Sequence, residues 1–153
     1  MTLLWINETR KHLGVKKDGL DDMVTVTGAS FDPTTQPWSG LFMAFIFAQI
    51  GVEPPANFLA PKAWANFGTA LSEPAMGCIV VLGPETRDTP HVGIYLGEDA
   101  SYYFLLGGNQ NDTVCVTQAP KGKDDVFRWP PDFGNLLVKG RVNTTIDKAK
   151  AQV

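Results

Sequence analysis

The feature that most constrains the fold is a run of ten nearly unbroken apolar residues, 41–50, in the first third of the chain. The run has no valine, it follows the sequence Pro-Trp-Ser-Gly at 37–40, and Gly51 ends it. An apolar segment without a polar stripe predicts a helix that is buried on all sides. Ser39 is then expected at or beside the N-terminus of this helix, where backbone N–H groups lack partners within the helix.

The rest of the chain divides into helices first and strands second. Periodicity and breaker residues predict an amphipathic helix over 2–13, a loop with at most one helical turn over 15–37, and a short helix over 61–67. Short β-branched or aromatic runs bounded by turn residues predict strands at 78–82, 91–96, 102–106, 113–117 and 126–129. This order favours an α+β fold, in which N-terminal helices pack on a small antiparallel sheet.

Length and charge limit the classes of protein that the chain can belong to. The 153 residues fit one domain, predicted over 1–131, followed by a polar C-terminal extension over 132–153 whose tail, 141–153, is expected to be exposed. The net charge is -3 and basic residues do not cluster, which argues against a nucleic-acid partner. The apolar run is about half as long as a bilayer crossing, so no membrane insertion is expected. The first residues lack the pattern of a secretory signal, so export inside a particle or release on lysis is expected.

The two cysteines, Cys78 and Cys115, both lie in strand-like runs. Free buried thiols are the expected state, and a disulfide between them is the alternative. Two cysteines alone cannot build a zinc site.

Three residues stand where the predicted elements begin or end. Ser39 opens the buried helix, His91 opens a strand, and Asn109 follows two glycines after the next strand. A nucleophile at a helix N-terminus is helped by the local positive potential, a histidine can take its proton, and an amide can fix the histidine tautomer. Each also has an ordinary explanation: a helix cap, a surface histidine and a turn residue.

Four short motifs in one order give the chain a family resemblance. They are Pro-Trp-Ser-Gly at 37–40, Gly-Cys-Ile-Val-Val-Leu at 77–82, His-Val-Gly-Ile-Tyr at 91–95 and Leu-Gly-Gly-Asn-Gln at 106–110. Together they resemble a phage and prophage branch of the papain-like NlpC/P60 and CHAP hydrolases. The aromatic-Arg-x-Pro run that often ends that branch is similar to Phe-Arg-Trp-Pro at 127–130. The resemblance covers roughly residues 2–131.

The resemblance implies a papain-like fold and a cysteine-peptidase-like site without metal or organic cofactor. Carried onto this chain, it implies Ser39 as nucleophile, His91 as base and Asn109 as the orienting residue, with Gln110 as competitor for that last role. Gln36 is a possible oxyanion donor, with a plain loop role as its alternative. The chain departs from the family at Cys78, where aspartate is usual, and above all at Ser39, where the family has the catalytic cysteine.

The implied function is peptidoglycan hydrolysis, by endopeptidase or amidase cleavage, in a phage lysis enzyme (endolysin) or a tail component that opens the wall. Such a protein resides in the virion or in the host cytoplasm before release, and phage tail or baseplate proteins are possible partners. Serine in place of cysteine is expected to reduce activity by orders of magnitude. Because the motifs around it are otherwise intact, an engineered serine is favoured over a natural one. The alternatives are an inactive structural virion or wall-binding protein on the same fold, and an injected bacterial toxin that attacks peptidoglycan.

Overall fold

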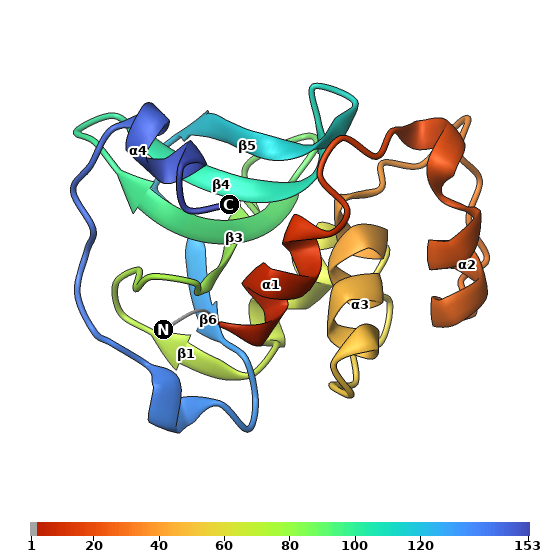
Figure 1. The fold of residues 1–153 in the computed structure, drawn as a ribbon, viewed down its shortest axis with the longest axis horizontal. Helices are drawn as coiled ribbons and strands as arrows, with labels where there is room; N and C mark the ends of the chain where they lie inside the picture. The colour runs from red at the N-terminus through yellow and green to blue at the C-terminus, as the bar shows by residue number, and fades with distance from the viewer. Residues whose placement is uncertain (1–2) are drawn as a thin grey trace.

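A six-stranded antiparallel sheet and a group of helices form the part of the chain that the computed structural model describes, residues 3–153 (Figure 1). Three helices come first: α1 (Leu4–Arg10), α2 (Asp21–Thr27) and α3 (Ser39–Gln49). The strands follow as β1 (Thr69–Leu71), β2 (Ile79–Leu82), β3 (His91–Glu98), β4 (Tyr102–Gln110), β5 (Thr113–Pro120) and β6 (Val126–Trp129). Their order in the sheet is β1-β6-β2-β3-β4-β5, which confirms the predicted α+β class.

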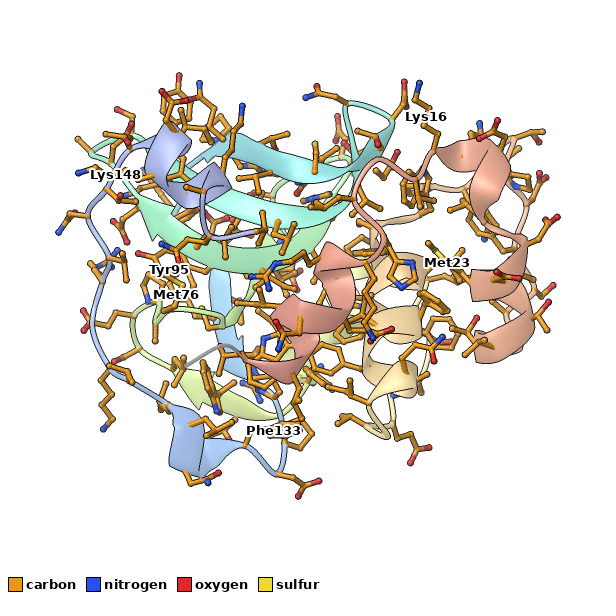
Figure 2. The ribbon with its side chains drawn as sticks, viewed as in Figure 1. Lys16, Met23, Met76, Tyr95, Phe133 and Lys148 are labelled. Carbon is orange, nitrogen blue, oxygen red and sulfur yellow. The ribbon has the colours of Figure 1, made fainter. Side chains whose placement is uncertain are left out.

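Helix α3 is the centre of the helical layer. All nine residues from Ser39 to Phe47 are buried, as the unbroken apolar run predicts. The helix packs against α1, α2, β3 and β4. Met23 of α2, which is 2% exposed, lies between α2 and α3 (Figure 2). Trp38 and Trp64 are also buried in this core.

The other helices differ in detail from the prediction. Helix α1 is shorter than the predicted 2–13, and the predicted helix at 61–67 is a 3-10 helix, η2 (Pro61–Asn66). Within 15–37 the chain forms a 3-10 turn, η1 (Lys17–Gly19), and the two-turn helix α2, where at most one turn was expected. Helix α2 ends at Gly28 in the left-handed conformation and is held by the burial of Met23.

The predicted strands all form, and the sheet gains one more. Strand β1 is three residues long and largely exposed, and its pairing with β6 stabilises it. Strand β2 is buried at all four residues because both faces of the sheet are covered there. Asn111 and Asp112 both have positive φ and form the two-residue turn between β4 and β5.

The C-terminal segment runs along the sheet, and most residues of 141–153 stay exposed. After the 3-10 turn η3 (Gly134–Leu136), the backbone runs beside the end of β3, where Val142 N–H donates to the Tyr95 hydroxyl at 3.0 Å. Helix α4 (Ile146–Lys150) then contacts β3 and β5 (Figure 1) and buries Ala149. A few apolar residues among many polar ones are therefore enough to fix this segment.

Both cysteines are free, which confirms the thiol prediction over the disulfide. Cys78 is buried, whereas Cys115 is only partly so. In the described part of the chain, no helix combines the length and apolarity that a membrane crossing needs.

Candidate active site

Ser39 is the first residue of α3 and its side chain is buried. The helix cap residue is Trp38, whose carbonyl accepts from Phe42 N–H at 3.0 Å, so Ser39 does not cap the helix. Ser39 is 1% exposed, and its Oγ has no hydrogen-bond partner among residues 3–153. A buried hydroxyl left without a partner costs about 1–3 kcal/mol. The hydroxyl is therefore bonded neither to the helix backbone nor to His91.

Gly40 lets a neighbouring loop reach the start of α3. A Cβ at this position would lie 2.1 Å from the carbonyl oxygen of Phe58 and 2.9 Å from that of Leu59. The Phe58 carbonyl also accepts a hydrogen bond from the indole N–H of Trp64 at 2.9 Å. The glycine of the Pro-Trp-Ser-Gly motif is thus required by the close approach of this loop to the residue after Ser39.

His91 is the first residue of β3 and its ring contacts Gln110. Its Nε2 lies 2.8 Å from Gln110 Oε1, and His91 pairs with Leu82 of β2. Burial lowers the pKa of His91 below its ordinary value, the Gln110 hydrogen bond opposes this effect, and the charge of Arg87 adds to it. The imidazole is therefore neutral at neutral pH, the state that a general base needs.

The direction of the His91–Gln110 hydrogen bond follows from the other bonds of Gln110. Its Nε2 donates to the backbone carbonyls of Leu105 at 2.9 Å and Cys115 at 2.7 Å, which uses both amide protons. Oε1 must then accept from Nε2–H of His91, since a neutral histidine carries one ring proton. This tautomer leaves Nδ1 free to accept a proton.

The orienting contact that was expected from Asn109 is made by Gln110. Strand β4 runs to Gln110, and its register shifts by one residue between the Gly107–Cys115 and Gln110–Thr113 pairs. Asn109 is the bulged residue, with φ of 57°. A bulge redirects the side chains that follow it, and here it brings Gln110 to His91.

Three glycines allow the two strands and α3 to meet here. A Cβ on Gly93 would lie 3.4 Å from Gln110 Oε1, and a Cβ on Gly107 would lie 3.0 Å from it. A Cβ on Gly108 would lie 2.7 Å from both Trp38 and Phe42. The end of β4 therefore contacts the residue before Ser39 on one side and holds the amide beside His91 on the other.

The remaining candidates have other roles. Gln36 is exposed, and its Oε1 accepts from Asp32 N–H at 2.8 Å, which accounts for it as a loop residue. Burial raises the pKa of the Cys78 thiol to about 12, so this thiol is unreactive. Burial also raises the pKa of Cys115, whose Sγ donates to the Gln110 carbonyl. Neither cysteine is a substitute nucleophile.

Within residues 3–153, no group of three or more His, Cys, Asp or Glu side chains is placed to hold a metal ion. Comparison of the chain with protein-family models, with curated proteins and with solved structures found no match.

Proposed function

We propose that the chain is a papain-like peptidoglycan hydrolase of the NlpC/P60 and CHAP type, with Ser39 in the place of the nucleophilic cysteine. The observation that carries the proposal is the hydrogen bond from His91 Nε2 to a Gln110 amide whose orientation two backbone carbonyls determine. An amide held in this way serves to keep Nδ1 of a neutral histidine unprotonated. Gln110 thus takes the role that the sequence assigned to Asn109.

In the proposed reaction, the side chain at position 39 attacks the carbonyl carbon of an amide bond while its proton passes to His91 Nδ1. The N–H groups in the first turn of α3 stabilise the oxyanion, because they have no partners within the helix. His91 then returns the proton to the departing amine, and water hydrolyses the acyl intermediate. Gln110 keeps the ring in one tautomer and does not touch the substrate.

The unpartnered hydroxyl of Ser39 supports a site built for cysteine. A thiol is a weak hydrogen-bond donor and tolerates burial without a partner, whereas a hydroxyl does not. The surroundings of position 39 therefore suit sulfur better than oxygen. Serine needs its proton removed during attack, since its hydroxyl does not ionise usefully, and the proposed activity of the Ser39 chain is accordingly low.

The alternative is a structural virion or wall-binding protein that kept this fold without the chemistry. The specific observation in its favour is that Ser39 Oγ is covered from solvent, so a substrate reaches it only after a local movement. Both proposals place the chain in a phage particle or in the host cytoplasm before release, and the hydrolase and the wall-binding protein share peptidoglycan as partner. Hydrolysis by a Ser39→Cys variant separates them.

Cosedimentation with purified peptidoglycan sacculi tests the partner that the hydrolase and the wall-binding protein share. We expect the chain to bind sacculi and to lose binding when the stem peptides have been removed and only glycan strands remain. The Ser39→Cys variant combined with His91→Ala should bind equally well, because binding to the ground state does not require the thiolate. A folded chain that fails to bind sacculi of several chemotypes would contradict the hydrolase and the wall-binding protein, and would leave the structural virion protein.

A further inference from the structure

A cavity of about 750 Å³ lies beside the start of α3. Three segments line it: residues 28–30 after α2, residues 36–37 before α3, and residues 57–61 before η2. Its volume lies within the range of about 300–1,000 Å³ that is typical of sites for small ligands. Figure 1 shows α2 beside α3, with which it is in contact.

The cavity adjoins the proposed nucleophile through two of its walls. Pro37 lies two residues before Ser39, and Phe58 and Leu59 approach the residue after it so closely that only glycine fits at Gly40. Ser39 itself does not line the cavity. A ligand held there would therefore extend away from the start of α3 and place one end near Ser39.

Hydrogen bonds hold two walls of the cavity in place. The 57–61 wall is anchored by the Trp64 indole on the Phe58 carbonyl and by Ala60 N–H on the Asn57 carbonyl at 2.9 Å. The 36–37 wall is held by the bond between Asp32 N–H and Gln36 Oε1. The cavity is thus formed before any ligand enters.

The lining contains no charged residue. Its polar side chains are Ser30, Gln36 and Asn57, and most of its other residues are alanine, proline, phenylalanine and leucine. Side-chain amides both donate and accept, which matches the N–H and C=O groups of a peptide. A charged ligand group would lose water here without meeting an opposite charge, which is unfavourable.

We propose that this cavity binds an uncharged peptide segment with small side chains, such as consecutive alanines, next to the amide bond that the site attacks. The inference rests on the proposed function and narrows its substrate: the acidic and basic residues of a peptidoglycan stem would lie outside the cavity. Selection of a neutral segment follows from the uncharged lining and the two amides.

An NMR titration of the chain with N-acetylated and amidated tri-alanine peptides, in the L and D series, tests the inference. We expect amide shifts concentrated in residues 28–30, 36–37 and 57–61, and binding at least about tenfold weaker when the central alanine is replaced by glutamate. Amide shifts confined to residues outside these three segments, or equal binding of the glutamate and tri-alanine peptides, would overturn the inference.

Two substitutions of Ala60, an exposed alanine in the 57–61 wall, test the inference further. Ala60→Trp fills the cavity and should weaken tri-alanine binding at least about tenfold, whereas Ala100→Trp, at an exposed alanine in the β3–β4 turn, should not change it. Ala60→Lys should shift the preference toward the glutamate peptide. Unchanged binding in the folded Ala60 variants would overturn the inference.

Failure of this inference differs from failure of the proposed function. If Ser39→Cys cleaves peptidoglycan while Ala60→Trp in the same background cleaves it equally well, the cavity assignment is wrong and the hydrolase stands. If the peptides bind as expected but Ser39→Cys cleaves nothing, the cavity assignment stands and the hydrolase proposal fails.

Discussion

Replacing Ser39 with cysteine is expected to raise hydrolysis of peptidoglycan by at least about 100-fold over the Ser39 chain. A thiol beside a histidine and at a helix N-terminus can be a thiolate before attack, whereas a serine hydroxyl cannot. The histidine is already oriented, because Gln110 holds His91 in the tautomer with a free Nδ1. Stability should be unchanged or slightly higher, since the buried hydroxyl without a partner is removed. Release of soluble muropeptides from sacculi, followed by mass spectrometry, measures the rate and identifies the bond.

Three double variants in the Ser39→Cys background give this prediction its controls. Adding His91→Ala should abolish the gain, and adding Gln110→Ala should remove most of it by releasing the imidazole. Adding Asn109→Gly should leave the rate nearly unchanged, because glycine keeps the positive φ of the bulge and Gln110 makes the contact. A folded Ser39→Cys protein that binds sacculi but cleaves none across several chemotypes would favour the structural protein.

Glu98, at the end of β3, is a buried carboxylate that joins the sheet to the C-terminal segment. It is 3% exposed and accepts hydrogen bonds from the Tyr95 hydroxyl at 2.7 Å, from Lys121, and from Arg141 at 3.1 Å. Figure 2 shows Tyr95 on β3 toward this end of the sheet. Burial raises the pKa of Glu98, but the bonds from Lys121 and Tyr95 and the charge of Arg141 lower it below its ordinary value.

Glu98→Ala is expected to lower the free energy of unfolding by about 1–3 kcal/mol, because the Tyr95 hydroxyl, Lys121 and Arg141 lose the buried acceptor that they share. Glu85→Ala, which removes an exposed ion pair with Lys62, should change it by less than about 1 kcal/mol. Since the pKa of Glu98 is lowered on folding, its contribution is present above the ordinary glutamate value and is lost as the pH falls through the folded-state value. Urea unfolding of both variants at neutral and acid pH measures this, and equal losses for Glu98→Ala and Glu85→Ala would contradict it.

The helical centre and most of the sheet could be predicted from the sequence, since their signals are local. A ten-residue apolar run can only be stable when buried, and β-branched or aromatic runs bounded by turn residues favour strands. Helix α2 was underestimated because valine and threonine fill it and its stability comes from packing on α3. Strand β1 was missed because three residues carry no period and pairing with β6 alone holds them.

Of the candidate site, the sequence predicted only the part that local signals determine. Ser39 and His91 lie at the element starts that the sequence indicated. The choice between Asn109 and Gln110 depends on one extra residue in β4, and a one-residue change of register cannot be derived from composition or turn signals alone. The packing of the C-terminal segment was missed for a related reason, because its anchors, Tyr95 and Glu98, are far away in the chain.

The pH dependence of thiol alkylation in the Ser39→Cys variant tests most directly whether position 39 and His91 form one reacting unit, and it needs no knowledge of the substrate. With iodoacetamide, and with the adduct at position 39 separated from those at Cys78 and Cys115 by peptide mass spectrometry, we expect the reaction midpoint at position 39 below about pH 7, well under the ordinary cysteine pKa of about 8.5. Adding His91→Ala should move the midpoint to the ordinary value or above, because burial alone disfavours the thiolate. Coinciding profiles for the two variants, both at or above the ordinary value, would contradict the papain-like site.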